Sequence, residues 1–229
     1  MARPSGHGTG FETRRQETID TAATLFARRG YAGTGIAEIG ETVGLGKGAL
    51  YYYIGPKENL LVEIQGRALR PLLRSARRID KLDEAPVLQL RLLSESLLEM
   101  ILRRLDHIRV YEHDYRYPQG ENLSRLLRQR REFEAIVRGL LKSGMETGAL
   151  GQMNSQLAVL QFLNLHNHTY QWGHPNRTWD AARLSQEYCA TLIAGLGRNG
   201  VSLYNVEAQV REFRMRYDGM TLMAHDNND

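Results

Sequence analysis

The stretch from Thr34 to Leu61, TGIAEIGETVGLGKGALYYYIGPKENLL, constrains the fold more than any other part of the chain. Its first segment has apolar residues at three- and four-residue spacing, which predicts a short helix: Ile36, Ile39 and Val43. Gly44 interrupts the pattern, and a second short helical segment follows over residues 47–53. A glycine at the turn permits a left-handed backbone, so the second helix can cross the first steeply. The stretch therefore predicts a helix-turn-helix.

The second predicted helix has an unusual polar face. Opposite the buried Leu50 it presents a cation, a bare backbone and two aromatic hydroxyls: Lys47, Gly48, Tyr51 and Tyr52. Such a face suits a DNA major groove, because lysine reaches a guanine edge or a phosphate and glycine allows close backbone approach. The alternative is that a tyrosine packs on a neighbouring helix, although three consecutive tyrosines cannot all face inward.

At these residues the chain resembles the DNA-binding domain of the TetR family of one-component transcriptional repressors. The resemblance covers residues 14–64, and its specific motifs are GYAGTGIAEIG and VGLGKGALYYYIGPKENLL. It implies an all-α fold, in which three N-terminal helices hold the helix-turn-helix. Further helices would dimerise and enclose an effector pocket. It also implies a homodimer that binds a palindromic operator in double-stranded DNA.

The resemblance assigns further DNA contacts. Thr34 and Gly35 would contact the DNA backbone, Thr34 would also cap the first helix, and Lys57 would contact a phosphate. The predicted DNA-binding residues are therefore Thr34, Gly35, Lys47, Gly48, Ala49, Tyr51, Tyr52, Tyr53 and Lys57. Two residues depart from the family pattern. Ala37 cannot hydrogen-bond to a base, and Gly40 replaces the usual alanine inside the first helix, at a cost of about 1 kcal/mol.

Composition sets broad limits. With 229 residues, 42% of them hydrophobic, the chain can form one sizeable domain or two small ones. A net charge of +4 is compatible with nucleic acid but does not require it. The single cysteine, Cys189, excludes an internal disulfide framework. No apolar run is long enough for a transmembrane helix, and the N-terminus lacks the apolar core of a signal peptide, so we expect a cytoplasmic protein.

The sequence divides into four predicted regions. Residues 1–12 form a disordered N-terminal tail, 13–57 the helix-turn-helix DNA-binding domain, 58–200 a helical effector-binding and dimerisation domain, and 201–229 a partly disordered C-terminal extension. Thr13 is the predicted cap of the most N-terminal helix, which precedes the helix-turn-helix. Pro71 predicts a kink or a break in a later helix. Two long amphipathic helices near the end of the third region match what a dimer-forming four-helix bundle requires.

A candidate effector site follows from the resemblance. Residues 111–117 interleave aromatic and ionisable side chains on the element that borders the effector cavity in the family. The predicted effector-binding residues are Tyr111, His113, Tyr115, Asn164, His168 and Trp172. Ordinary half-buried packing is the alternative for each of them. The segment LNLHNHTYQWGHPN also resembles TetR-type regulators of fatty-acid and steroid breakdown, which implies a small hydrophobic or amphipathic effector, with an acyl-CoA as a candidate.

The histidines do not suggest a metal site or an active site. His166 and His168 are two residues apart, so they point to nearly opposite sides of a helix. His113 and Asp114 are adjacent, but no nucleophile elbow, phosphate loop or dinucleotide fingerprint accompanies them. We expect no metal, no cofactor and no catalysis.

Together these patterns predict an effector-responsive TetR-type repressor that binds its operator as a homodimer. The alternative is a small-molecule sensing or sequestering protein with degenerate DNA binding. Ala37 and Gly40 in the first helix of the motif favour that alternative, because alanine cannot hydrogen-bond to a base and glycine weakens the helix.

Overall fold

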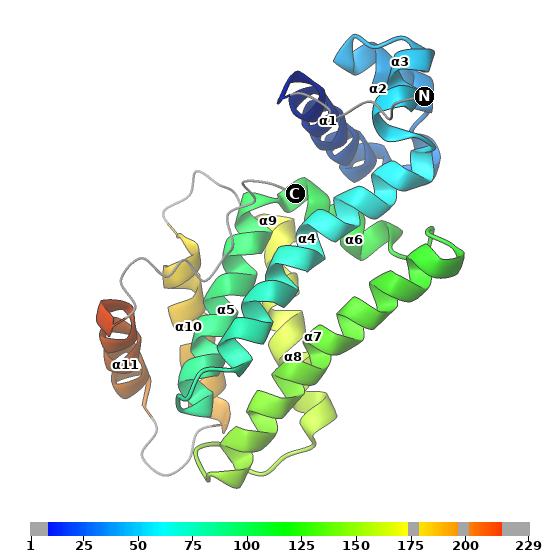
Figure 1. Cartoon of the computed structure of the whole chain (residues 1–229). Coiled ribbons are helices and arrows are strands. Elements are labelled where there is room, and N and C mark those ends of the chain that lie inside the picture. Colours follow the sequence, from blue (N-terminus) through cyan, green and yellow to red (C-terminus); the bar gives the residue numbers. More distant parts are fainter. Residues whose placement is uncertain (1–8, 174–178, 197–201, 217–229) are drawn as a thin grey trace, which may run out of the picture. The chain divides into compact units, whose positions relative to one another are not determined.

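The computed structural model describes residues 9–173, 179–196 and 202–216. Within these ranges every regular element is an α-helix, as predicted (Figure 1). None of the described helices is long and apolar enough to cross a membrane. The chain forms two compact units, which we describe separately. The first contains the described residues up to Ala68 together with Asp106–Leu126, and the second contains Leu69–Leu105 and the described residues from Leu127 onward.

The first unit holds the helix-turn-helix and extends beyond the predicted 13–57 boundary. Its helices are α1 (Thr9–Gly33), α2 (Ile36–Val43), α3 (Lys47–Ile54), the start of α4 (Lys57–Asp80), α6 (Leu105–Asp114) and the start of α7 (Gly120–Glu146). The predicted cap at Thr13 is wrong, since α1 begins at Thr9; residues 1–8 of the predicted tail lie outside the described residues. Gly30 interrupts α1 with φ 77° and ψ 157°, a conformation that favours glycine.

One apolar core holds the first unit together. Its residues come from five helices: Ile19, Ala22, Ala23, Phe26, Ile39, Leu50, Ile54, Leu60, Leu61, Ile64 and Val110. Burying a side chain such as Phe26 or Leu50 contributes about 1.5–3 kcal/mol relative to leaving it exposed. Val110 lies on α6 and is 1% exposed, so α6 is part of this folded unit although it is distant in sequence.

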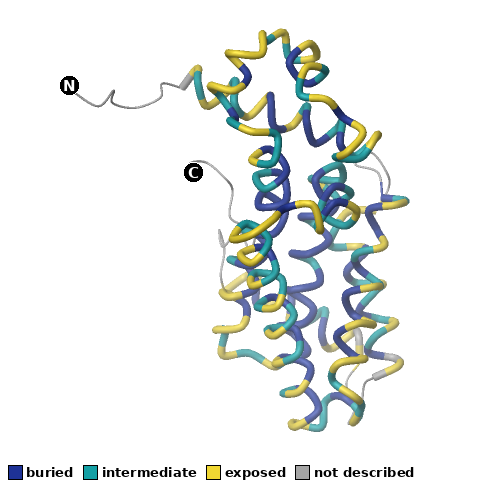
Figure 2. Tube along the Cα trace, turned by 90° about the vertical axis from the view of Figure 1, so that its right-hand side faces the viewer, coloured by how far each residue is buried: buried dark blue, intermediate teal, exposed yellow. Residues whose placement is uncertain are grey.

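The second unit is a helical bundle around α5. It contains α5 (Pro86–Arg103), α8 (Ser155–Asn167), α9 (Thr169–Trp172), α10 (Ala181–Leu196), α11 (Leu203–Arg216) and the remaining parts of α4 and α7. α5 is buried over most of its length and packs mainly against α10. Figure 2 shows buried positions on the facing sides of the helices and exposed positions on their outer sides. This distribution is typical of an amphipathic bundle with one central helix.

Several helix boundaries differ from the sequence prediction. α4 continues through Pro71, so the predicted break is wrong. The first of the two long amphipathic helices expected near the end of the third region forms two pieces, α8 and α9, with His168 between them. Asn154 caps α8, because its Oδ1 accepts hydrogen bonds from the N–H groups of Gln156 and Leu157 at 2.9 and 3.1 Å. In the predicted C-terminal extension, 203–216 form α11, while 201 and 217–229 lie outside the described residues.

Candidate nucleic-acid interface

The turn between α2 and α3 is tight and depends on two glycines. Gly44 ends α2 in the left-handed conformation, with φ 67° and ψ 34°, as the sequence predicts. The N–H of Leu45 then donates to the carbonyl of Gly40 at 2.8 Å. A Cβ atom on Gly40 would lie 2.7 Å from the Leu45 carbonyl oxygen. Gly40 therefore permits this close approach, which gives it a structural reason independent of DNA reading.

α3 has one buried side and one exposed side. Leu50 and Ile54 are 1% and 8% exposed and belong to the core. The opposite side is open to solvent, and it carries Lys47, Gly48, Ala49, Tyr51 and Tyr52. This orientation follows the apolar spacing in the sequence. α3 thus presents a cation, uncovered backbone and hydroxyl groups on one surface, while the contact of that surface with DNA stays a prediction.

The three consecutive tyrosines have different environments. Tyr51 and Tyr52 are 44% and 66% exposed, whereas Tyr53 is half-buried. Phe11, at the start of α1, lies against both Tyr52 and Tyr53, with ring centroids 5.4 and 4.9 Å apart. Tyr52 and Tyr53 therefore pack against the start of α1. Contact of these tyrosines with a duplex stays a prediction.

The structure corrects the predicted capping role of Thr34, while its contact with DNA stays a prediction. Its side chain is 1% exposed, and its hydroxyl donates to the carbonyl of Gly30 at 3.0 Å. The N-cap of α2 is Gly35, and no side chain caps it. Thr34 stabilises the link between α1 and α2, and the exposed Gly35 backbone remains the candidate for a phosphate contact at the start of α2.

Lys57 also differs from the expectation that it points toward a phosphate. Its Nζ donates to the carbonyl of Tyr31 and lies 4.2 Å from the centroid of the Tyr31 ring. Burial lowers the pKa of Lys57, and the negative charge of Asp114 acts in the opposite direction. The ammonium group thus binds the protein rather than extending into solvent. A phosphate contact by Lys57 would require this hydrogen bond to break.

α6 is hydrogen-bonded to α1 and α4 of the first unit. A buried carboxylate oxygen of Asp114 accepts the N–H of Tyr31 at 3.1 Å, and Gln65 donates to the Asp114 carbonyl at 3.1 Å. Burial raises the pKa of Asp114, while the hydrogen bond from Tyr31 opposes that rise. Thr24 donates to Asp106 at 2.7 Å, at the start of the same helix. Sequence reasoning missed these contacts because their partners are distant in sequence and no local pattern marks them.

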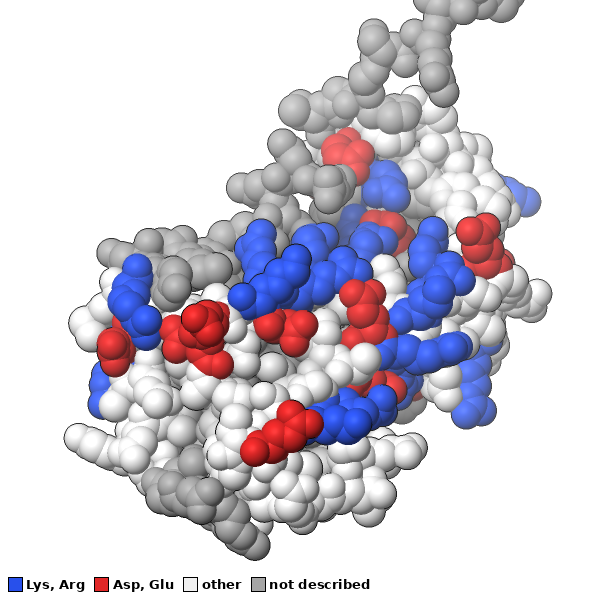
Figure 3. All heavy atoms as spheres, turned by 60° about the horizontal axis from the view of Figure 1, so that its bottom comes forward, with Lys and Arg blue, Asp and Glu red and all other residues white. Residues whose placement is uncertain are grey.

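Charged groups around the first two helices are mostly paired. Arg29 forms an ion pair with Glu38, and Arg14 pairs with Glu17 at 2.9 Å. Elsewhere, basic side chains form a band on one face of the molecule, with acidic side chains beside it (Figure 3). In the second unit, for example, Arg77 and Glu132 make a bidentate pair with distances of 2.6 and 2.8 Å. Positive charge alone therefore does not mark the DNA-binding surface.

The predicted effector-binding residues belong to different units. Tyr111, His113 and Tyr115 lie on or just after α6 in the first unit, where His113 is exposed and the tyrosines are half-buried. The remaining three lie in the second unit: Asn164, His168 and Trp172. Asn164 and His168 are exposed on α8 and at its end, and Trp172 packs edge-on against Trp179, with centroids 6.4 Å apart. Their association around one ligand stays a prediction.

The buried side of α8 carries groups that the prediction did not select. His166 is fully buried, its Nε2 lies 2.6 Å from the Ser94 hydroxyl, and its Nδ1 lies 2.6 Å from the Phe162 carbonyl. Burial lowers the pKa of His166 to about 4, so its ring is neutral at pH 7. A narrow apolar cavity of about 30 Å³ lies in this unit, lined by Val87, Leu90, Leu141, Leu150, Ala158, Phe162, Cys189, Leu192 and Ile193. Asn164 and His168 are not among its lining residues.

The residues in the described part of the chain offer no grouping of three or more histidine, cysteine, aspartate or glutamate side chains suited to a metal ion. Cys189 is buried, and burial raises the pKa of its thiol to about 11. A thiol with such a pKa is a poor nucleophile at neutral pH.

Two family matches decide the class of this chain. The family described as "Bacterial regulatory proteins, tetR family" matches residues 19–64, and "Tetracyclin repressor-like, C-terminal domain" matches residues 83–196. The chain belongs to the TetR family. It is therefore a TetR-type transcriptional regulator, and the first of these matches falls on the helix-turn-helix described above.

Individual relatives agree with this assignment. The TetR-family chain is 25% identical to the HTH-type transcriptional repressor KstR2 of Rhodococcus jostii (strain RHA1) over 199 residues, which are 84% of this chain and 96% of that protein. The solved structure of the ketosteroid transcriptional regulator KstR2 of Mycobacterium tuberculosis has a TM-score of 0.77 at 22% identity, covering 86% of this chain and 100% of that one. AibR, solved in complex with isovaleryl coenzyme A and operator DNA, has a TM-score of 0.69 at 20% identity, with 78% and 97% covered. At these identities the solved structures support the TetR fold alone.

Proposed function

We propose that this protein is a repressor that binds a palindromic operator as a homodimer and inserts α3 into the major groove. The observation that carries the proposal is the surface of α3. Its apolar residues Leu50 and Ile54 are buried, while Lys47 and Tyr51 face solvent. In such a motif the second helix reads base edges through residues near its N-terminus. The operator lies on DNA in the cytoplasm, and the protein has no catalytic role there.

The residues of the interface divide into two kinds. Lys47 and Tyr51 are the candidates for base or phosphate contacts, and Gly48 allows the backbone of α3 to come close to the duplex. No heavy atom outside its neighbours lies within 4 Å of the Cβ position on Gly48, so that side of the helix is open. Gly35 offers backbone N–H groups to a phosphate at the start of α2. Thr34 and Lys57 hydrogen-bond to the backbone of α1 and would hold this surface in place.

The homodimer would form through α8 and α10. Leu157 and Leu160 on α8 are 58% and 47% exposed, although large apolar side chains are usually buried. Asn164 continues the same exposed side of α8, and α10 has its own exposed stripe at Arg183, Glu187 and Thr191. Two such helices from each copy can bury these leucines in a four-helix bundle.

This pairing can be tested by sedimentation. Changing Leu157 and Leu160 together to glutamate is expected to convert a dimer into a monomer, because four carboxylates would be placed in the apolar contact. The matched control is Gln209→Glu, which adds one charge at an exposed position of α11, outside the proposed contact of α8 and α10. A doubly substituted protein that still sediments as a dimer would exclude this surface.

The effector is proposed to be an acyl-CoA or a related hydrophobic acid. The proposal draws on the relatives, since one is named a ketosteroid regulator and another was solved with isovaleryl coenzyme A. α6 carries Tyr111 and His113 and is hydrogen-bonded to Tyr31 through Asp114, so a ligand contacting α6 would act directly on the unit that holds α3. Such a ligand weakens DNA binding only by its preference for a state with misplaced α3 helices.

Fluorescence anisotropy with labelled duplexes from the protein's own upstream intergenic region tests the DNA-binding proposal. We expect nanomolar binding that persists at moderate salt, and far weaker binding to a scrambled duplex. Acyl-CoAs of several chain lengths, added to the complex, are expected to lower the anisotropy for at least one length. Equal, salt-sensitive binding to both duplexes would favour a sensing protein with a degenerate DNA-binding unit.

One observation favours the second function, a sensing protein with a degenerate DNA-binding unit. Ala37 is exposed on α2, where it offers no hydrogen bond to a base. Gly40 no longer favours it, because the contact with Leu45 explains this glycine. The second function predicts tight effector binding without any sequence preference on DNA.

A further inference from the structure

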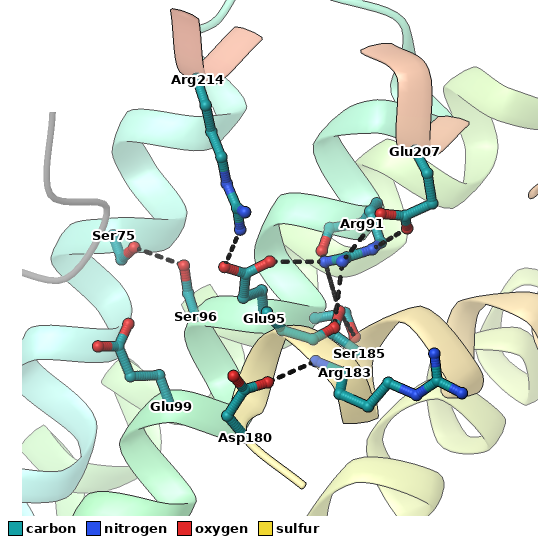
Figure 4. A network of polar contacts seen from close by, with 12 residues as sticks. Ser75, Arg91, Glu95, Ser96, Glu99, Asp180, Arg183, Ser185, Glu207 and Arg214 are labelled. Carbon is teal, nitrogen blue, oxygen red and sulfur yellow. Dashed lines mark hydrogen bonds and ion pairs between the residues drawn. The ribbon is translucent and has the colours of Figure 1, made fainter. Parts of the chain in front are cut away.

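Arg91 is a buried cation in the middle of the second unit. Its side chain is 2% exposed, and it lies on α5 (Figure 4). The guanidinium donates to Glu207 of α11 at 2.6 Å, to Glu95 at 2.8 Å and to the hydroxyl of Ser185 at 2.8 Å. It also donates to the carbonyl of Ala182 at 3.2 Å. A buried charge of this kind depends on its carboxylate partners, because removing one leaves an uncompensated ion.

α11 supplies one of these partners and covers the surface around it. The inner side of α11 is apolar, with Val206, Val210 and Phe213 at most 3% exposed. Glu207 lies among them and points to Arg91, while Arg214 pairs with Glu95 of α5 (Figure 4). α11 begins beyond residue 196, where the match to the C-terminal domain of the family ends. The helix thus presents an apolar surface with a single carboxylate directed at a buried arginine.

A chain of hydrogen bonds connects this arginine with α8. Ser185 of α10 donates to the hydroxyl of Ser94 at 2.8 Å, and Ser94 lies 2.6 Å from Nε2 of His166. The partners in this chain are all buried. Replacing the group bound to Arg91 would therefore change the hydrogen bonds of Ser185 on α10 and, through Ser94, of His166 on α8. These two helices carry the proposed dimer contact.

We propose that Arg91 is the acid-binding end of an effector site and that α11 occupies this site when no effector is bound. Glu207 stands in for the carboxylate of an amphipathic acid, and Val206, Val210 and Phe213 stand in for its hydrocarbon chain. A fatty acid of moderate length competes with α11 for the same surface of α5 and α10. None of the predicted effector-binding residues belongs to this site. The inference rests on the proposed function only for the idea of an effector, and it names a free carboxylic acid as the class of ligand.

The test is calorimetry of the full-length protein with sodium octanoate. Glu207→Gln removes the internal carboxylate, so it is expected to bind octanoate about tenfold or more tightly than the unmodified protein. The matched control is Glu212→Gln on the exposed part of α11, which is expected to bind as the unmodified protein does. Octanol, which has the chain without the charge, is expected to show no gain with Glu207→Gln. Equal octanoate affinity in all three proteins would overturn the proposal.

A second variant covers the case in which Glu207→Gln does not fold. Arg214→Ala removes a second ion pair between α11 and α5, the pair with Glu95, and leaves Arg91 and Glu207 unchanged. It is expected to bind octanoate more tightly than the unmodified protein, by a smaller factor than Glu207→Gln. Hydrogen exchange in residues 203–216 is expected to rise when octanoate binds. Unchanged affinity and unchanged exchange would both contradict the displacement of α11.

Octanoyl-CoA in the same titration separates the free acid from the thioester. A gain in octanoyl-CoA affinity with Glu207→Gln as large as the gain for octanoate would overturn the assignment of a carboxylate to Arg91. These titrations contain no DNA, so their failure leaves the proposed operator binding intact. A failure to bind DNA, in turn, leaves the octanoate result standing.

Discussion

α3 and α8 both have one buried side and one exposed side, but the chemistry of these sides is reversed. α3 buries Leu50 and exposes Lys47 and Tyr51. α8 buries His166 in a hydrogen-bonded chain and exposes Leu157 and Leu160. A polar exposed side suits a charged and hydrated partner such as DNA, whereas exposed leucines suit a protein surface that excludes water. The two helices therefore mark the two kinds of partner that we propose.

The largest effect is expected on the buried side of α8, and it depends on pH. The folded ring of His166 has a pKa of about 4, below the ordinary value of 6.5, because burial disfavours its charge. Between these values the unfolded chain takes up a proton that the folded chain does not. Stability is therefore full above pH 6.5 and falls by about 3 kcal/mol as the pH drops to 4.

Urea unfolding at pH 7 and pH 4.5 measures this loss. His166→Gln is expected to lose less stability on acidification than the unmodified protein, since the glutamine at position 166 does not titrate. His168→Gln, at the exposed end of the same helix, is the control and is expected to behave as the unmodified protein. The same acid loss in both variants would show that other groups cause it.

The second effect is expected at the turn that positions α3. Gly40→Ala places a methyl group 2.7 Å from the Leu45 carbonyl oxygen, so the turn must shift. We expect a loss of about 1–3 kcal/mol in the free energy of unfolding, although alanine is the better helix former. Thermal or urea melts measure it. An unchanged or more stable Gly40→Ala protein would mean that the turn accommodates the methyl group without cost.

Gly48→Ala is expected to give the smallest effect on stability, in the opposite direction. The new Cβ meets no heavy atom within 4 Å, and alanine lowers the entropy cost of forming α3. We expect a gain of about 0.5 kcal/mol together with weaker operator binding, because the methyl group would lie between the backbone and the duplex. A more stable protein with undiminished operator affinity would show that close backbone approach at Gly48 is unimportant.

The sequence predicted the orientation of α3 because this helix is short, is set off by a glycine turn and has a single buried side. Leu50 alone was enough to place Lys47 and Tyr51 on the outside. The same reasoning separated His166 from His168 but did not tell which side of α8 faces the interior. That choice depends on α5 and α10, which meet α8 from distant parts of the chain.

Lys57 and Thr34 show the limit of matching a motif. Both have the residue type that the family uses, but their side chains bind Tyr31 and Gly30 of the same chain. Asp114, which binds the backbone of Tyr31, had no local signal at all because its partner lies 83 positions earlier. Contacts of this kind appear only when the fold brings the partners together.

The most direct test of the central claim compares Lys47→Ala with Lys57→Ala in one operator titration by fluorescence anisotropy. If α3 is the reading helix, Lys47→Ala is expected to weaken operator binding about 10–100-fold and leave thermal stability unchanged. Lys57→Ala is expected to lower thermal stability, because the contact with Tyr31 is lost, and to change operator affinity much less. Full operator affinity in Lys47→Ala, or the larger loss of affinity in Lys57→Ala, would contradict the account.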